Sequence, residues 1–137
     1  MTTTIRKVDY FKLETAHQPG AAASALGALR DAGVNLLVFT GFPTGRRAQM
    51  DFIPEDPAAF KAAVRKIRLH VTPKKGGFLV QGDDRVGAIA DVMEVLALAQ
   101  INVTAIDAVS AGGGRFGAVL WVKPADGRKA AKALGIA

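Results

Sequence analysis

The pair Gly20-Ala21 precedes Gly33-Val34-Asn35-Leu36, and the same arrangement returns as Gly87-Ala88 before Gln100-Ile101-Asn102-Val103. In both copies the glycine lies 15 residues before the asparagine (20 to 35 and 87 to 102), and the copies are 67 residues apart (20 to 87). A constant spacing of this kind indicates a duplicated structural unit. The sequence therefore predicts one repeat over residues 1–73 and a second over residues 74–137.

The same offset of 67 residues relates apolar and turn-forming positions along both halves of the chain. It pairs Phe11 with Phe78, Leu26 with Met93, Phe52 with Val119, Pro57 with Pro124 and Ile67 with Leu134. An offset that holds without gaps would place matched residues on matched faces of the two repeats.

Composition limits the class of protein. The chain has 137 residues, 50% of them hydrophobic, and no cysteine, so disulfide and thiol chemistry are excluded. Each half alone is too small to bury much surface, so the halves are expected to pack side by side. No apolar run is long enough to span a membrane, and Met1–Thr4 lacks a signal-peptide core, which leads us to expect a cytoplasmic protein without a membrane partner.

Hydrophobic periodicity predicts the same order of elements in each half. In the first repeat we expect strands at 5–15, 34–40, 48–53 and 69–72, and helices at 21–32 and from residue 57. In the second we expect strands at 78–82, 101–109 and 116–123, and helices at 87–99 and 126–134, after a boundary at residues 74–77. This is an α+β protein with two ferredoxin-like βαββαβ repeats, each an antiparallel sheet with helices on one face. The final strand of the second repeat is missing or supplied from elsewhere.

The two strand-to-helix turns carry a family resemblance. They read His17-Gln18-Pro19-Gly20-Ala21 and Asp84-Arg85-Val86-Gly87-Ala88, and each is followed by a helix and by the Asn-containing strand entry. This pattern resembles ACT domains, and the whole chain is similar to small stand-alone tandem ACT proteins. The resemblance implies domains that pair side by side and bind an amino acid or a similar small effector at the pairing interface.

The residues expected to bind the effector come from the turns and from the entries to the second strands. Free N–H groups at a helix start suit a carboxylate, and an Asp-Arg pair suits the two charges of a zwitterion. Structural roles remain open, because glycine also permits close turns, asparagine bonds local backbone and surface ion pairs contribute little. The expected ligand-binding residues are His17, Gln18, Pro19, Gly20, Ala21, Asn35, Leu36, Asp84, Arg85, Val86, Gly87, Ala88, Asn102 and Val103.

No sequence feature indicates catalysis. Ser24 and Ser110 lack a neighbouring histidine or a nucleophile motif, and Gly112–Gly114 precedes a strand and therefore reads as a hairpin turn. Two histidines without metal-ligand spacing predict no metal site. We therefore expect neither catalytic residues nor a cofactor.

The strand 116–123 predicts self-association. Phe116, Leu120 and Val122 are assigned to the sheet face that the helices leave open, and such an apolar face needs a cover. A homodimer is the expected cover, and the first residues of the chain folding over that face are the alternative.

The function expected from these observations is a non-catalytic regulatory or sensor protein, with the second strands of its repeats meeting at the centre. Ligand binding would favour one domain arrangement that a partner reads, which is allosteric regulation by linkage. One alternative is a basic RNA-binding module, since the net charge is +6 and RNA-recognition domains share this topology. Another is an accessory subunit of an amino-acid biosynthetic enzyme. Nucleic acid is not the expected partner, because the basic residues are spread along the chain.

Overall fold

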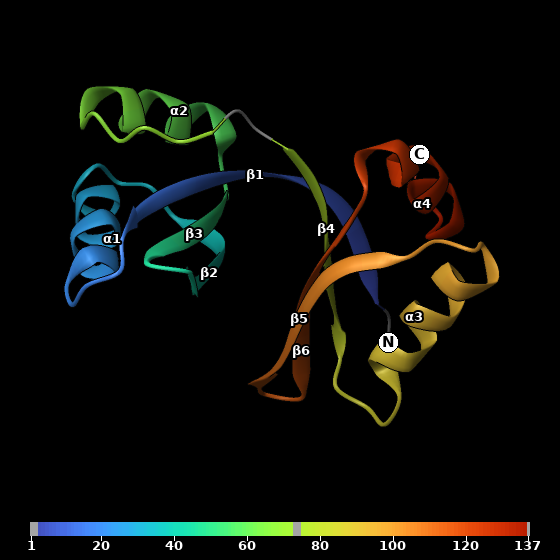
Figure 1. Ribbon diagram of the computed structural model, residues 1–137. Helices are drawn as coiled ribbons and strands as arrows, with labels where there is room; N and C mark the ends of the chain where they lie inside the picture. The colour runs from blue at the N-terminus through green and yellow to red at the C-terminus, as the bar shows by residue number, and fades with distance from the viewer. Residues whose placement is uncertain (1–2, 73–74, 137) are drawn as a thin grey trace. The chain divides into compact units, whose positions relative to one another are not determined.

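The structure, a computed structural model, describes residues 3–72 and 75–136 (Figure 1). The chain divides into two compact units. Unit 2 comprises Asp9–Lys75, and unit 1 joins the N-terminal residues up to Val8 to Gly76–Ala137. The compact units differ from the sequence repeats at one end, because the first residues group with the second repeat.

Unit 2 contains the elements expected for the first repeat, with one exception. They are β1 (Thr4–Ala16, whose later part lies in this unit), α1 (Ala21–Asp31), β2 (Leu36–Thr44), β3 (Arg47–Pro54) and α2 (Pro57–Lys66), and the strand order is β2-β3-β1. The expected strand at 69–72 does not form as a regular strand. Thr72 N–H donates to the Lys12 carbonyl at 2.8 Å. In return the Lys12 N–H donates to Thr72 Oγ1 at 3.2 Å, where the Thr72 carbonyl would accept in a regular antiparallel pair.

Unit 1 contains the elements of the second repeat and the first part of β1. They are β4 (Lys75–Asp83), α3 (Ala88–Leu98), β5 (Val103–Gly112), β6 (Arg115–Val122), a 3₁₀ turn η1 (Pro124–Asp126) and α4 (Gly127–Ala133), with the strand order β1-β4-β6-β5. The division between the two units falls between Lys75 and Gly76, within the boundary expected at 74–77, and β4 begins at Lys75.

The first part of β1 lies where the final strand of a βαββαβ unit belongs. Thr4 Oγ1 donates to the Gln81 carbonyl at 3.4 Å, across to β4. A side chain at Gly82 would place its Cβ 2.7 Å from Thr3 Oγ1. Glycine at position 82 therefore permits the close approach of these two segments.

The expectation that the second strands meet at the centre is wrong. Among the strands of the described residues, β2 neighbours only β3 and β5 neighbours only β6, so the two strands are at the ends of the strand order. Both are edge strands, and both contain an irregular residue near the start of their pairing, between Leu36 and Val38 and between Val103 and Ala105. Such bulges disrupt the regular ladder that would template further pairing.

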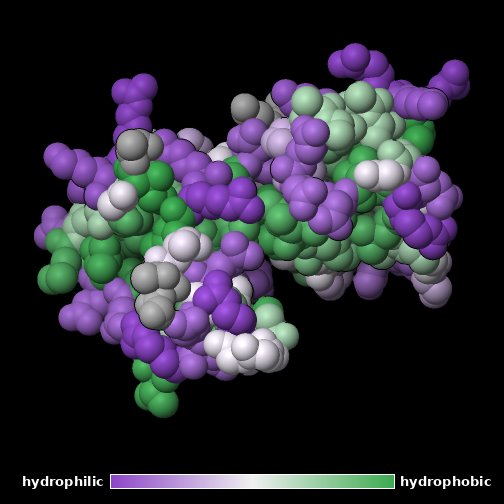
Figure 2. Space-filling model, turned by 180° about the vertical axis from the view of Figure 1, so that it is seen from behind, coloured by the Kyte–Doolittle hydropathy of each residue, from purple (hydrophilic) through white to green (hydrophobic). Residues whose placement is uncertain are grey.

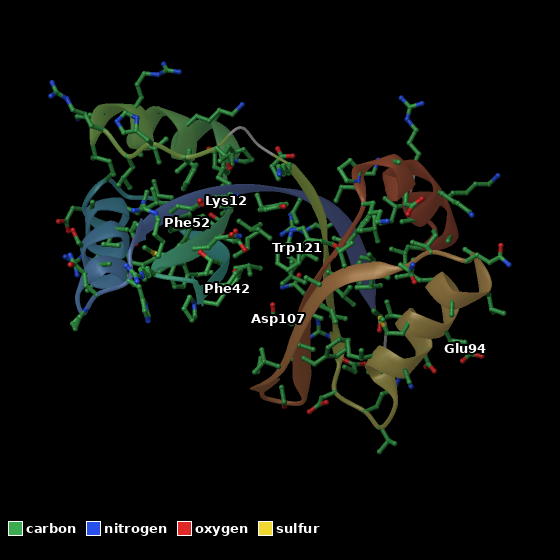
Figure 3. The ribbon with its side chains drawn as sticks, viewed as in Figure 1. Lys12, Phe42, Phe52, Glu94, Asp107 and Trp121 are labelled. Carbon is green, nitrogen blue, oxygen red and sulfur yellow. The ribbon has the colours of Figure 1, made fainter. Side chains whose placement is uncertain are left out.

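Each unit has its own core between the sheet and its helices. In unit 2 the buried rings of Phe11, Phe52 and Phe60 pack together, with centroids of Phe11 and Phe60 4.6 Å apart. Phe52 lies between the strands and helices of that unit (Figure 3). In unit 1 the core gathers residues of β4, α3, β6 and α4, and its fully buried members include Val80, Leu96 and Leu120.

The assignment of Phe116, Leu120 and Val122 to the open sheet face is wrong. Phe116 and Leu120 belong to the core of unit 1, where Leu120 has no exposed surface, and Val122 packs against that core. The homodimer surface inferred from these residues is therefore not available.

The reason for this error is a gap in the repeat. Phe11 is opposite Phe52 in unit 2, and its counterpart Phe78 is opposite Leu120, so the offset between β3 and β6 is 68 residues (52 to 120). The extra residue lies in the irregularity between Ser110 and Gly112 on β5. A shift of one residue moves every side chain of a strand to the other face.

In the part of the chain that the structure describes, the ends of α1, α2, α3 and α4 share one backbone geometry. A residue with positive φ follows each helix: Gly33 (76°), Arg68 (61°), Gln100 (58°) and Gly135 (79°). The next residue donates back to the helix in each case, for example Ile101 N to the Leu96 carbonyl at 3.0 Å. Glycine adopts this conformation without steric cost, whereas Arg68 and Gln100 adopt it under strain.

Replacing Gln100 with glycine should therefore raise the free energy of unfolding by about 1 kcal/mol. Urea denaturation of both proteins measures the change. The reverse exchange at the equivalent position, Gly33→Gln, serves as the control and should lower the stability by a similar amount. Destabilisation by Gln100→Gly would show that the Gln100 side chain contributes more than its backbone strain costs.

Several large hydrophobic side chains reach the surface, and Figure 2 shows hydrophobic areas beside hydrophilic ones. The exposed large hydrophobic residues are Phe39, Phe42, Val86, Val95, Leu98 and Val109. Within residues 3–72 and 75–136, none of the helices has the length and apolar character needed to cross a membrane.

Candidate functional site

The turn between β4 and α3 begins a helix without a side-chain cap. Gly87 is the N-cap residue with φ 80°, and no side chain caps the first turn. By contrast, Asp56 caps α2 by accepting from the N–H groups of Ala58 at 3.0 Å and Ala59 at 3.2 Å. The first N–H groups of a helix have no carbonyl partner within it. In α3 the Ala88 N–H donates to the Arg85 carbonyl of the turn at 3.2 Å, so the donors suited to an anion are the N–H groups that follow it.

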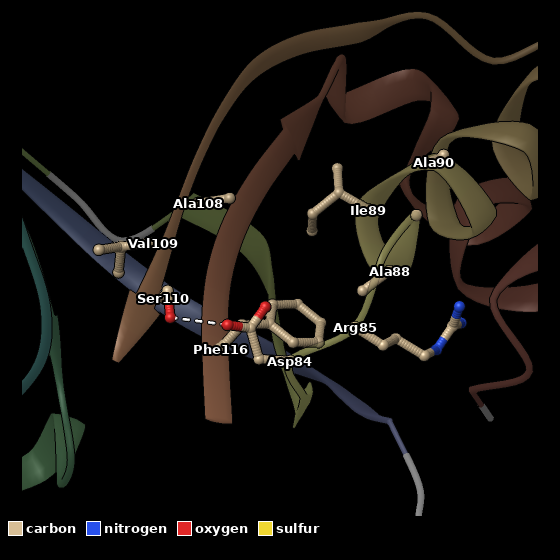
Figure 4. Close-up of a pocket in the computed structure, with 10 residues that line it drawn as sticks. Asp84, Arg85, Ala88, Ile89, Ala90, Ala108, Val109, Ser110 and Phe116 are labelled. Atoms are coloured by element: carbon tan, nitrogen blue, oxygen red, sulfur yellow. Dashed lines mark hydrogen bonds between the residues drawn. The ribbon is translucent and has the colours of Figure 1, made fainter. Parts of the chain in front are cut away.

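A pocket of about 310 Å³ lies at this helix start (Figure 4). Its volume is at the lower end of the range for small-molecule sites, which favours a small ligand. The turn, the first residues of α3, the end of β5 and the start of β6 form its walls. The lining residues are Asp84, Arg85, Gly87, Ala88, Ile89, Ala90, Ala108, Val109, Ser110 and Phe116.

Asp84 connects the turn to the β5–β6 hairpin. Its Oδ2 accepts from Ser110 Oγ at 2.7 Å, the bond drawn as a dashed line in Figure 4. Its backbone N–H donates to the Gly114 carbonyl at 2.9 Å. The two bonds hold a carboxylate at the pocket in a defined position, where it can accept from an ammonium group.

Arg85 is engaged elsewhere in this conformation. Its side chain extends away from Ser110 (Figure 4), and its guanidinium forms an ion pair with Asp91 of α3. Its Nη1 also donates to the Val86 carbonyl at 3.4 Å. Because more than half of each side chain of the Arg85–Asp91 pair is exposed, the pair is weak and a ligand carboxylate could compete for Arg85.

Asp83 and Arg115 form a second polar link between β4 and β6. Arg115 Nη1 donates to Asp83 Oδ1 at 2.9 Å, and this hydrogen bond lowers the pKa of Asp83 below its ordinary value. The two residues are also opposite each other in the strand register. The hairpin that carries Ser110 is thus attached to β4 next to the turn.

The first turn has a different environment. Gly20 is the N-cap of α1 with φ 86°, again without a side-chain cap. Gln18, Pro19, Gly20 and Ala21 line a groove of about 490 Å³, but its other walls are α1, β1 and residues 67 and 69. The position equivalent to Asp84 is His17, which is exposed, and β2 has Pro43 where β5 has Ser110. The first turn therefore lacks the carboxylate–hydroxyl pair.

The remaining expected site residues are not at the unit 1 pocket. Asn35 donates to Glu55 Oε2 at 3.2 Å, while Leu36 and Val103 pack against the cores of their own units. Asn102 lies before the start of β5, whereas Ala108 at the pocket is six residues later, about 20 Å along the strand. Val86 is fully exposed. A role for Asn35 or Asn102 toward an opposing repeat stays a prediction.

The sequence interpretation missed the contribution of β5 to the pocket, namely Ala108, Val109 and Ser110. The β-α-β order of the predicted elements could have identified these three residues. In a β-α-β crossover, the carboxyl ends of both strands lie at the same edge of the sheet, so the end of β5 must approach the turn that follows β4. In the described part of the chain, no three His, Cys, Asp or Glu side chains are grouped as a metal site would require.

Comparison with known proteins rests on structure. No protein-family model and no curated protein sequence match the chain. Protein BT0572 from Bacteroides thetaiotaomicron superposes with a TM-score of 0.81 at 14% identity, over 96% of this chain and 88% of that one. The ligand-free regulatory subunit of aspartate kinase from Thermus thermophilus gives 0.63 at 16% identity, over 97% and 94% of the two chains. The Thermus flavus regulatory subunit gives 0.59 at 19% identity, over 98% and 95%.

The fold is of the ACT type. This confirms the α+β fold class and the resemblance that the two turns carry. At these identities the similarity shows the fold alone. A function can therefore be inferred only from the residues of each ACT-type unit.

Proposed function

We propose that this chain is a non-catalytic regulatory protein that binds a small amino acid at the turn between β4 and α3. The observation that supports this most is the position of Asp84, held by Ser110 beside an uncapped helix start in a pocket of small volume. The ligand carboxylate would accept from the N–H groups that follow Ala88 in the first turn of α3. Its ammonium group would donate to Asp84.

The lining of the pocket also bears on the kind of amino acid. Three alanines, at positions 88, 90 and 108, and Gly87 leave room, while Ile89 and Phe116 provide apolar contact. A small or apolar ligand side chain fits this lining better than a charged one, because burying a charge without a partner is costly.

The fold supports a regulatory role in which ligand binding is communicated to a partner. Two of the similar structures are regulatory subunits of aspartate kinase, so an enzyme partner is part of the proposal. Effector binding would shift the population of conformations that the partner recognises. The homodimer stays a prediction, now without the surface that motivated it.

The alternative of an RNA-binding module has less support. Such modules stack bases on exposed aromatic side chains of the sheet. Of the aromatic residues that the alternative would use on central strands, Phe116 and Trp121 are 5% and 8% exposed and Tyr10 is partly buried. The exposed rings of Phe39 and Phe42 lie on the edge strand β2. The basic net charge alone is a general property that favours weak, salt-sensitive contact with any polyanion.

Calorimetric titration with each of the amino acids at millimolar concentration tests the proposal. At least one small or apolar amino acid should bind, and Asp84→Asn should weaken that binding about tenfold or more, since a charge-assisted hydrogen bond is lost. His17→Asn changes the equivalent position of the first turn to the same residue and should leave the affinity unchanged. Equal loss in both variants, or no binding by the unaltered protein, would contradict the proposal.

A further inference from the structure

Unit 2 has a second groove, which the proposed effector site does not use. The chain turns back after α2 and runs alongside it (Figure 1), and a groove of about 450 Å³ lies between α2 and the segment Leu69–Thr72. Phe11 and Val64, 3% and 7% exposed, line it together with Leu69 and Val71. Its apolar lining and volume are in the range of small-molecule sites.

The groove stays open because the segment beside α2 is not a regular strand. Its described residues have one backbone hydrogen bond to β1, from Thr72 N to the Lys12 carbonyl. At the other end, Leu69 N donates to the Val64 carbonyl and ends the helix. Between these two attachments Leu69 and Val71 stay partly exposed, above the buried Phe11 of β1 at the bottom of the groove.

The rim of the groove is cationic. Lys61 and Arg65 of α2 and His70 of the returning segment are exposed lining residues, and none of the described lining residues is acidic. Lys61 and Arg65 are four residues apart on a helix, so their side chains are neighbours on one face. The whole stretch from Pro57 to Thr72 contains no Asp or Glu.

The helix dipole explains only part of this charge. Basic residues in a last helical turn interact favourably with the carbonyl end, which accounts for Arg65 and Lys66. Lys61 lies in the middle of α2, and His70 lies beyond its end, so the dipole does not account for these two residues.

We infer that this groove binds an organic carboxylate with an apolar body. The Arg65 guanidinium matches a carboxylate with two parallel hydrogen bonds, and the Lys61 ammonium lies next to it. The apolar body lies on the partly exposed side chains of Leu69 and Val71, where it removes apolar surface from water. This ligand class differs from the zwitterion of the proposed effector site, because the described lining residues of the groove include no acidic group for an ammonium.

Titration with octanoate, below its micelle concentration, tests the inference by backbone amide NMR. Octanoate should shift amide signals of residues 61–72. The double variant Lys61→Ala/Arg65→Ala should bind it about tenfold more weakly, since two exposed cation contacts are removed. Arg128→Ala/Lys132→Ala removes the same charges at the equivalent positions of α4 and should bind octanoate like the unaltered protein.

Three further outcomes decide the ligand class. Octanol should bind more weakly than octanoate and without sensitivity to Lys61→Ala/Arg65→Ala, because it lacks the charge. If acetate shifts the same signals with equal affinity, the rim holds an adventitious ion only and the inference is wrong. A short RNA that binds these residues while octanoate does not would also overturn it.

Amino-acid binding at the unit 1 turn should be unchanged in the Lys61→Ala/Arg65→Ala protein, which separates this inference from the proposed function.

Discussion

Replacing Leu120 with lysine is expected to unfold unit 1, at a cost of about 4 kcal/mol or more in the free energy of unfolding. Leu120 has no exposed surface and packs among residues of β4, α3 and α4. The ammonium group would therefore be buried without a partner. Urea denaturation followed by circular dichroism measures the loss.

Leu98→Lys is the matched control for this substitution. Leu98 lies on α3 of the same unit and is 81% exposed, so the same chemical change should alter stability by less than about 0.5 kcal/mol. A Leu120→Lys protein that stays folded and only changes its oligomeric state would contradict the position of Leu120 in the core. It would favour the open-face assignment made from the sequence.

Replacing Gly87 with valine is expected to destabilise the protein by about 2 kcal/mol and to weaken effector binding. The reason is the backbone, because Gly87 has φ 80°, a conformation that β-branched residues avoid. Space is not the cause, since no atom lies within 4 Å of the Cβ that the substitution adds. Thermal and urea unfolding measure the stability, and calorimetry with the bound amino acid measures the affinity.

Gly127→Val isolates the contribution of φ. Gly127 begins α4 with φ −57°, and its added Cβ also meets no atom within 4 Å. This variant should therefore keep its stability or gain a few tenths of a kcal/mol, because valine has a higher helix propensity than glycine. Equal destabilisation by both substitutions would show that the left-handed conformation at Gly87 is not what the valine disturbs.

The sequence predicted the order of elements because periodicity and turn residues are local signals. Asp56 caps α2 and Gly33 ends α1 as expected, and the duplicated turns indicated the fold class. The face of β6 could not be predicted from the offset, because one extra residue on β5 shifts the pairing of the next strand. A register depends on contacts between strands, and a single sequence contains no direct record of them.

The candidate site was predicted in part for a related reason. The turn residues Asp84, Arg85, Gly87 and Ala88 are contiguous, so a motif identifies them. Ser110 comes from another strand, and its hydrogen bond to Asp84 depends on the topology. The Asp-Arg pair is visible in the sequence at the second turn, whereas the replacement of Ser110 by Pro43 at the first turn depends on the strand register.

The proposal that a small amino acid binds at the unit 1 turn is tested most directly by backbone amide NMR during titration with the amino acid that calorimetry identifies. Our account predicts shifts of signals from residues 84–90, 108–110 and 116, which line the pocket. Signals of residues 17–21 should stay in place. Shifts confined to residues 17–21, or no shifts at saturating ligand, would contradict it.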